Sequence, residues 1–315
     1  MRILIVGRGA PYSAEFFYKK AFSDFGNEVF LINSYTGIKN PFLYRIILTR
    51  TNFFKFTLSD LWINRNLETR IDEIDPDAII FFKGDMISTE VISELSNNWS
   101  IYLLYPDTYK FPLLLSGRLP YFNAIYTASN NIGPYYSMGA RKVVTVPWAC
   151  DPNFHRKIDI EKKYNTTFIG TAYIERRRII RKLEDVDVFG DFWYGFGKNA
   201  HKSVNGEDFI RTINQSRINL NLQAKISVLA DAPTMRTFEI AGCGGFQISD
   251  SMPSLKKYFP ILPTFEDISE LKDLINYYLE NPGDSEEIAL KTMEICHSSY
   301  KYTEAPRTQV KLSTM

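Results

Sequence analysis

The chain has 315 residues, which is too many for one small core and fits two domains. Apolar residues make up 45% of it, a share that excludes an intrinsically disordered protein. The formal net charge of +1 argues against nucleic acid as a partner, because nucleic-acid-binding domains carry a strongly basic surface.

The first half of the chain alternates short apolar runs with longer mixed segments. The runs that predict buried strands are RILIVG (2–7), EVFLI (28–32), DAIIFF (77–82), SIYLLY (100–105), NAIYTA (123–128) and KVVTVP (142–147). Most of the intervening stretches are long enough for a crossover helix. This spacing predicts a parallel α/β sheet.

The second half repeats the pattern. Its predicted strands are TTFIG (166–170), VDVFG (186–190), RINLNL (217–222), GGFQIS (244–249) and FPIL (259–262), followed by helices near 266–280 and 284–300. Two such sheets predict an α/β chain of two Rossmann-like domains, with the carboxyl ends of both sheets around a central cleft.

The segment 147–163, PWACDPNFHRKIDIEKK, has two prolines, no clear period and a cluster of charge, so it is predicted to be a hinge. The expected domains are therefore residues 1–150 and 151–315. The tail from Tyr300, interrupted by Pro306, is expected to be helical and to pack back on the first domain.

Neither the cysteines nor the histidines have the spacing of a metal site. Cys150, Cys243 and Cys296 are far apart and include no CxxC pair, which predicts free thiols in a reducing, cytoplasmic compartment. The histidines are predicted to be surface or hinge residues; they are His155, His201 and His297.

The segment 44–56, YRIILTRTNFFKF, combines three basic residues with three phenylalanines and no acid. Two interpretations stay open. It is either a patch for peripheral membrane contact or a lipid acceptor, or a core helix whose basic ends snorkel to solvent.

Ligands of open α/β sheets bind beyond the carboxyl ends of the strands, so the residues that follow each strand are the site candidates. After the first strand, Gly7 and Gly9 suggest a dinucleotide loop, but the third glycine is missing and Pro11 stands where the helix should open. The second strand ends at Asn33 without the acid that would hold a ribose. The pattern therefore disfavours an NAD-dependent dehydrogenase.

In the second half, Gly170 and Thr171 form the turn after the first strand, and ERRR follows at the next helix start. Arg176 and Arg177 would lie at the ligand edge of the sheet. A guanidinium there can hold a phosphate with two parallel hydrogen bonds, although arginines on a helix are also typical of a solvated face.

The stretch RTFEIAGCGGFQISD (236–250) places Arg236 and Glu239 three positions apart, on one face of a predicted helix. Arg236 and the free amides of the helix start would supply the other side of the phosphate clamp. Glu239 would accept hydrogen bonds from the hydroxyls of a ribose. The glycines predict the turn into the next strand.

This stretch, with FIGTAYIERR and INLNLQ, resembles the carboxyl-terminal half of the CgeB-like glycosyltransferases, relatives of the group 1 glycosyltransferases with the GT-B fold. The resemblance covers residues 165–260 and extends more weakly to FFKGD, YLLYPDTY and VPWACDP in the first half. It implies a hexosyltransferase-like enzyme of glycan biosynthesis. Such an enzyme holds a nucleoside-diphosphate sugar, linked to UDP, GDP or dTDP, in its second domain without a metal, and a glycan, lipid or protein acceptor on its first.

Carried over by position, Glu239 resembles the ribose-binding acid, and Arg236 with Arg176 or Arg177 resembles the diphosphate contacts. Asp231 stands eight positions before Glu239, where the family often has a glutamate near the donor sugar. The usual clamp lysine has no clear counterpart unless Lys225 or an arginine replaces it.

An inverting transfer also needs a base from the opposite domain. Asp107 in YPDTY and Asp85 in FFKGD both follow strands of the first half and are the candidates. Two other functions stay open at this point: a nucleotide-sugar epimerase or hydrolase on the same fold, and a non-catalytic protein that binds a sugar nucleotide.

Overall fold

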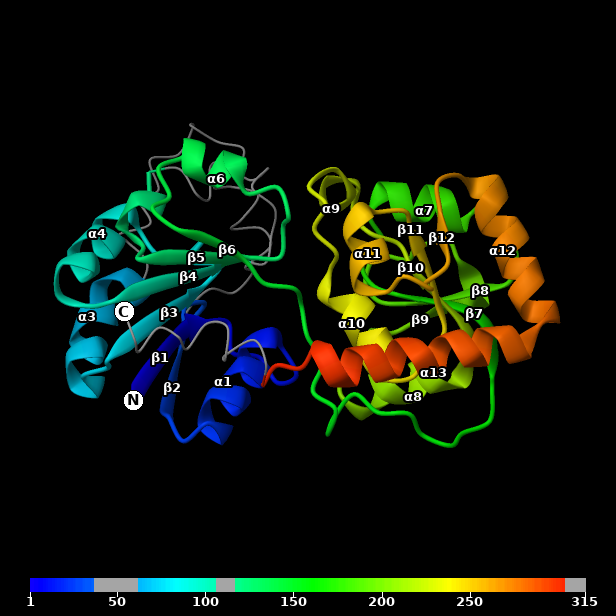
Figure 1. The fold of residues 1–315 in the computed structure, drawn as a ribbon, viewed down its shortest axis with the longest axis horizontal. Coiled ribbons are helices and arrows are strands. Elements are labelled where there is room, and N and C mark those ends of the chain that lie inside the picture. The colour runs from blue at the N-terminus through cyan, green and yellow to red at the C-terminus, as the bar shows by residue number, and fades with distance from the viewer. Residues whose placement is uncertain (37–61, 106–116, 304–315) are drawn as a thin grey trace. The chain divides into compact units, whose positions relative to one another are not determined.

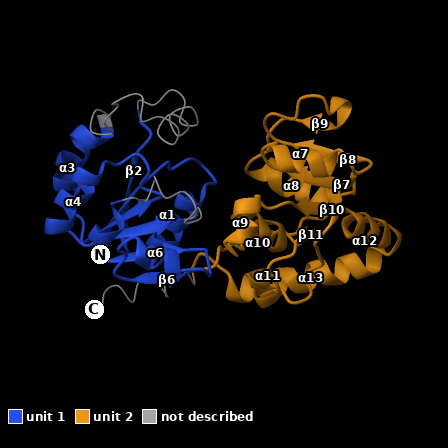
Figure 2. Ribbon diagram, turned by 90° about the horizontal axis from the view of Figure 1, so that it is seen from above, with its two compact units in different colours: residues 1–146 blue, residues 147–315 orange. Residues whose placement is uncertain are grey.

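The computed structural model describes residues 1–36, 62–105 and 117–303. The chain divides into two compact units, Met1–Val146 and Pro147–Met315 (Figure 2). The predicted patch 44–56, the candidate base Asp107 and the end of the tail lie outside the described residues. Among the described residues, no helix has the length and apolar character needed to cross a membrane.

The described part of the first unit contains a sheet of six parallel strands in the order β2-β1-β3-β4-β5-β6 (Figure 1). The strands are β1 (Arg2–Gly7), β2 (Glu28–Asn33), β3 (Ala78–Phe82), β4 (Ile101–Tyr105), β5 (Ala124–Thr127) and β6 (Val143–Thr145). The helices are α1 (Ala14–Asp24), α3 (Trp62–Ile74), α4 (Thr89–Asn98) and α6 (Gly133–Ser137), with a 3-10 turn at Leu119–Tyr121. The six strands predicted for this half are confirmed.

Strand β3 shows why this half folds as a parallel sheet. All five of its residues, AIIFF, are buried, as in a strand that is covered on both faces. The helices begin where the sequence offers caps: the Ser13 hydroxyl accepts from the Phe16 amide, and the Ser88 hydroxyl accepts from the Val91 amide.

The described part of the second unit contains another sheet of six parallel strands, ordered β12-β11-β10-β7-β8-β9. The strands are β7 (Tyr164–Ile169), β8 (Val186–Phe189), β9 (Ala200–His201), β10 (Ser216–Asn221), β11 (Gln247–Asp250) and β12 (Thr264–Phe265). The helices are α7 (Ile174–Ile180), α8 (Glu207–Gln215), α9 (Lys225–Leu229), α10 (Met235–Gly242), α11 (Pro253–Tyr258), α12 (Ile268–Glu280) and α13 (Pro282–Ser299), with a 3-10 turn at Gly197–Asn199. The α/β class with two Rossmann-like units is thereby confirmed.

One predicted strand is misplaced. Residues 259–262 form no strand, because Phe259 is the C-cap of α11 and its amide bonds to the Leu255 carbonyl. The strand comes two residues later, as β12, after Pro263. The apolar character of FPIL reflects the burial of Phe259 and Leu262 and not membership of the sheet.

The segment predicted as a hinge is built into the second unit at its start. Cys150 is fully buried, its amide donates to the Tyr300 carbonyl, and its carbonyl accepts from the Tyr302 amide. Backbone hydrogen bonds therefore hold the first residues of this segment beside the end of α13.

The order of the second sheet contains one reversal. From β7 the chain adds β8 and β9 on one side, and then returns to place β10 on the other side of β7. Ligands of open α/β sheets bind at such a switch point, outside the carboxyl ends of the two strands. The edge between β7 and β10 is therefore the place to look for a site.

Substitution of Gly190, in the loop after β8, tests how tightly this edge is built. Gly190 has φ +146°, and a Cβ atom there would lie 2.3 Å from the Gly170 carbonyl oxygen. We expect Gly190→Ala to lower the free energy of unfolding by about 1–3 kcal/mol, measured by denaturant titration. The control is Gly283→Ala in the first turn of α13, where an added Cβ meets no atom within 4 Å. Equal losses in both variants would contradict the expectation.

Candidate functional site

The residues at the switch point match the predicted turn. Gly170 and Thr171 follow β7, and Leu222 follows β10. The Gly170 carbonyl accepts a hydrogen bond of 2.8 Å from the Trp193 indole, so the loop after β8 is tied to the end of β7. This hydrogen bond therefore fixes the loop after β8 and the loop after β7 relative to each other.

Arg176 spans the switch point. Its Nε donates to the Leu222 carbonyl at 3.0 Å, and its Nη1 donates to the Thr171 carbonyl at 3.2 Å. Its guanidinium also lies 5.2 Å from the ring centroid of Phe168. Burial lowers the pKa of Arg176. These two bonds use two of the five guanidinium N–H groups, so the arginine is oriented and keeps donors for an anion.

Arg177 contacts a different loop. Its Nη1 and Nη2 donate to the carbonyls of Phe192 and Tyr194, in the loop after β8. These two residues are 50% and 74% exposed. Tyr173, just before α7, is 48% exposed. The resemblance implied Arg176 or Arg177 as a diphosphate contact; here Arg177 fixes a loop that carries two exposed aromatic residues.

Arg236 and Glu239 lie together near the start of α10, as their spacing predicts. Arg236 Nη1 and Glu239 Oε2 are 2.9 Å apart, and the guanidinium is 4.3 Å from the ring centroid of Phe209. The Glu239 side chain is 6% exposed and that of Arg236 is 31% exposed. The two residues therefore form an ion pair whose acid is buried and whose arginine reaches solvent.

His155 is the second neighbour of Glu239; it lies in the segment predicted as a hinge, and it is not a surface residue. It is 1% exposed, and its Nε2 lies 3.9 Å from Glu239 Oε1. Its Nδ1 accepts from the Asp151 amide at 3.0 Å, so the neutral ring carries its proton on Nε2, facing the carboxylate. No spacing signal could find this residue, because it lies 84 positions before its partner in a segment without period.

Buried amide and hydroxyl side chains connect α10 to the sheet. The Asn221 amide donates to Thr237 Oγ1 at 2.8 Å and to Gln247 Oε1 at 2.9 Å. The Gln247 amide donates to the Thr237 carbonyl at 2.9 Å. Gln223 Oε1 accepts from the amide of Thr234, the N-cap of α10, at 3.2 Å. These bonds set where α10 begins, and hence where Arg236 and Glu239 lie.

Asp250, at the end of β11, is a site residue that the sequence did not single out. Its Oδ2 accepts a hydrogen bond from the backbone N–H of Gln223 at 2.6 Å. Burial raises the pKa of Asp250, and the nearby Arg176 opposes this. Arg236 in turn lowers the pKa of Arg176, after the larger effect of burial. Arg176, Arg236 and Asp250 therefore share one electrostatic neighbourhood, and its signal in the sequence is an acid at a strand's carboxyl end.

The amino-acid sequence and the fold have known relatives. Residues 175–308 match the family model described as glycosyl transferase-like. The spore protein CgeB of Bacillus subtilis (strain 168) is 22% identical over 268 residues, which cover 75% of this chain and 83% of CgeB. Residues 175–308 therefore carry a glycosyl transferase-like domain, and three quarters of the chain is similar to CgeB.

Solved structures show which fold this chain has. Sucrose-phosphate synthase (tll1590) from Thermosynechococcus elongatus superimposes with a TM-score of 0.71 at 9% identity, covering 100% of this chain and 98% of that one. Anabaena Alr3699/HepE, in complex with UDP and glucose, superimposes with a TM-score of 0.69 at 11% identity, covering 100% of both chains. The chain has the GT-B fold of these two proteins.

Asp231 lies beside the start of α11. Its Oδ1 accepts from the Ser254 amide at 2.9 Å, so it caps this helix, and its backbone has φ +47°. Asparagine and aspartate are the residues that tolerate this left-handed conformation best after glycine. This capping role gives a structural reason for an aspartate, and not the longer glutamate, at position 231.

In the first unit, Asp85 follows β3 at the carboxyl edge of the sheet, as predicted. Its side chain is buried, and Oδ1 accepts from the Tyr35 hydroxyl at 2.8 Å. The buried Arg118 donates to the neighbouring Gly84 carbonyl at 2.9 Å, and burial lowers the pKa of Arg118 while Asp85 opposes this.

Among the described residues, no group of three or more His, Cys, Asp or Glu side chains could hold a metal ion.

The burial of His155 predicts a pH dependence of stability. Burial lowers the pKa of His155 from its ordinary 6.5, more than Glu239 and Asp151 raise it. The unfolded chain therefore binds a proton at a pH where the folded chain does not, and stability falls as the pH drops from 6.5 toward the folded pKa. We expect His155→Asn to flatten this decline, measured as the free energy of unfolding between about pH 5 and pH 8. Parallel profiles for wild type and variant would contradict this assignment.

Proposed function

We propose that this protein transfers a sugar from a nucleoside-diphosphate sugar, held by the second unit, to an acceptor held by the first. The observation that carries the proposal is the placement of Arg176. It lies across the β7–β10 switch point, with the Arg236–Glu239 pair in the same electrostatic neighbourhood. The UDP and glucose in the Anabaena HepE complex support a nucleotide sugar as donor.

In this proposal the diphosphate is held by arginines. Arg176 and Arg236 are like charges whose proximity lowers the pKa of Arg176, and an anion between them would relieve that repulsion. The first amides of α10 add donors at the helix start. Donors fixed before the reaction stabilise the leaving diphosphate as the sugar bond breaks, so the transfer proceeds without a metal ion.

The nucleoside would be held by Glu239 and by the exposed rings. A carboxylate has about four acceptor sites, so the contacts to Arg236 and His155 leave capacity for ribose hydroxyls. Arg177 holds the loop that presents Phe192 and Tyr194, on which a base can stack. Asp231 would lie near the donor sugar and would have a structural role there, because it caps α11.

The acceptor would be a glycan, a lipid or a protein bound by the first unit. We assign the base of an inverting transfer to Asp85 or Asp107, which both follow strands of this unit. The buried Asp85 would need its contact with Tyr35 to open before it accepts a proton. We place the reaction in the cytoplasm, in keeping with the free, buried cysteines.

Substitution of Glu239 tests the donor site. We expect Glu239→Gln to weaken binding of the matching UDP-, GDP- or dTDP-sugar by tenfold or more, because hydrogen bonds to a charged acceptor are worth about 1.5–3 kcal/mol. Binding is measured by isothermal titration with each nucleotide sugar in turn. The control is Glu287→Gln on α13, whose carboxylate is exposed and pairs only with Lys291 among the described residues.

Two results of this titration would count against the proposal. Unchanged affinity in Glu239→Gln removes the ribose contact. Absence of binding of every nucleotide sugar to the wild type removes the donor site itself. A melting temperature recorded for each variant separates loss of binding from loss of the fold.

A further inference from the structure

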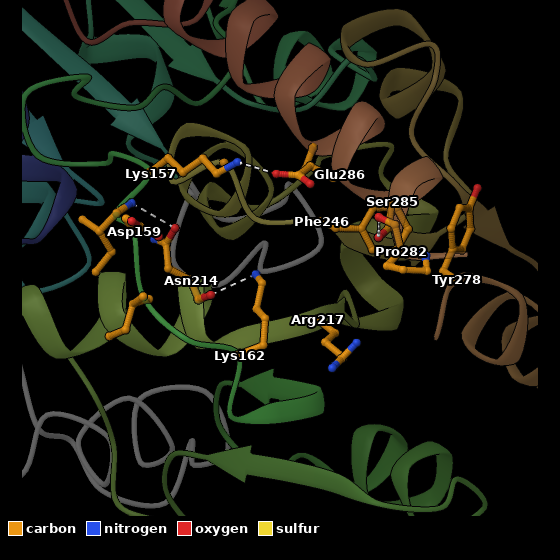
Figure 3. Close-up of a pocket in the computed structure, with 14 residues that line it drawn as sticks. Lys157, Asp159, Lys162, Asn214, Arg217, Phe246, Tyr278, Pro282, Ser285 and Glu286 are labelled. Atoms are coloured by element: carbon orange, nitrogen blue, oxygen red, sulfur yellow. Dashed lines mark hydrogen bonds and ion pairs between the residues drawn. The ribbon is translucent and has the colours of Figure 1, made fainter. Parts of the chain in front are cut away.

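The second unit has a cavity of about 620 Å³ at the opposite edge of its sheet (Figure 3). Its walls come from the segment 157–162, from Asn214 and Arg217 around the start of β10, and from the start of α13. This volume is within the range of about 300–1,000 Å³ that is usual for sites of small molecules.

The cavity is separate from the candidate donor site. Arg217 is the second residue of β10, whereas Leu222 directly follows the last residue of that strand. Five residues of extended chain span about 16 Å. A molecule in the cavity would therefore be a second ligand and not part of the donor.

The cationic side chains of the cavity differ in what they already contact. Lys157 Nζ pairs with Glu286 at 2.9 Å, as Figure 3 shows. Lys162 Nζ donates to the carbonyls of Asn214 and Ser216 at 2.9 and 2.8 Å, which uses two of its three N–H groups. Arg217 is exposed, and its side chain makes no hydrogen bond or ion pair with another described residue.

Positive charge therefore exceeds negative charge around Lys162. Burial lowers the pKa of Lys162, and the neighbouring Lys157 and Arg217 lower it further, while Glu286 alone among its main neighbours raises it. Asp159 also lines the cavity and is an exposed residue. An anion that contacts both Lys162 and Arg217 would balance this charge.

The rest of the wall suits an organic phosphate. Pro282, Ser285 and Glu286 line the cavity, so the first turn of the 18-residue helix α13, with its free amides, borders it. Within that turn, an added Cβ at Gly283 would meet no atom within 4 Å. The rings of Phe246 and Tyr278 also line the cavity, with centroids 4.5 Å apart, and offer an apolar face.

We propose that this cavity binds a small phosphate monoester, with the phosphate held by Arg217, Lys162 and the start of α13, and the organic part beside Tyr278. Inorganic phosphate supplies the anion alone, and ribose 5-phosphate supplies the anion with an organic part. Both are titrated into the full chain up to about 10 mM, and backbone amide shifts are followed by NMR. Shifts are expected at residues 157–162, 217 and 283–286.

The key variant is Arg217→Gln, which changes an exposed side chain without a described partner, so we expect the fold to stay intact. We expect it to weaken binding of ribose 5-phosphate at the cavity tenfold or more. The control is Arg178→Gln on α7, another exposed arginine, and we expect its affinity to stay within twofold of wild type. Tighter binding of ribose 5-phosphate than of phosphate supports the contact of the organic part.

Two outcomes overturn the proposal: no cavity shifts in the wild type, or equal affinities for wild type and Arg217→Gln. The same spectra report separately on residues 170–176 and 235–239. Shifts confined to those residues would support the donor site and count against the cavity. Shifts confined to the cavity residues would support the cavity and leave the donor site without support from this titration.

Discussion

The second unit depends on one set of buried hydrogen bonds, which joins the start of α10 to β10 and β11. Apolar packing alone tolerates small shifts of a helix along a sheet, because it is not directional. Thr237 removes that freedom, since its hydroxyl and carbonyl accept bonds from Asn221, Gln223 and Gln247. A shift of one residue would leave several buried polar groups without partners, at about 1–3 kcal/mol each. The polar pattern therefore fixes the position of Arg236 and Glu239.

The charges at this edge follow from the same constraint. Glu239 and Asp250 are both largely withdrawn from water, and a buried carboxylate is stable only when it is bonded or paired. Arg236 and His155 flank Glu239, and the Gln223 amide bonds Asp250. Each acid thus has partners from its own unit. Within the Arg236–Glu239 pair, the arginine is the member that reaches solvent, and the proposed donor site would use it to hold an anion.

Hydrophobic period predicts most of this fold, and helix spacing predicts the pairing of Arg236 with Glu239. The misplaced strand at 259–262 shows the limit of period, because a short apolar run does not distinguish a strand from a buried helix end. Arg176 and Arg177 show another limit. Adjacent helix residues point about 100° apart, so neighbours in the sequence contact different loops. His155 and Glu239 are 84 positions apart in the sequence, and no local pattern predicts a contact over that separation.

The glycines that end α10 have a role beyond the turn into β11. A Cβ at Gly242 would lie 2.7 Å from the Cβ of Cys150 and 3.1 Å from the Cβ of His155. A Cβ at Gly244 would lie 3.1 Å from the Cβ of Lys157 and from the sulfur of Met293. The segment 150–157 can therefore lie against α10 only because these positions lack side chains. That close approach brings His155 to Glu239, so the small residues in AGCGG help to set the surroundings of the buried acid as well as the chain reversal.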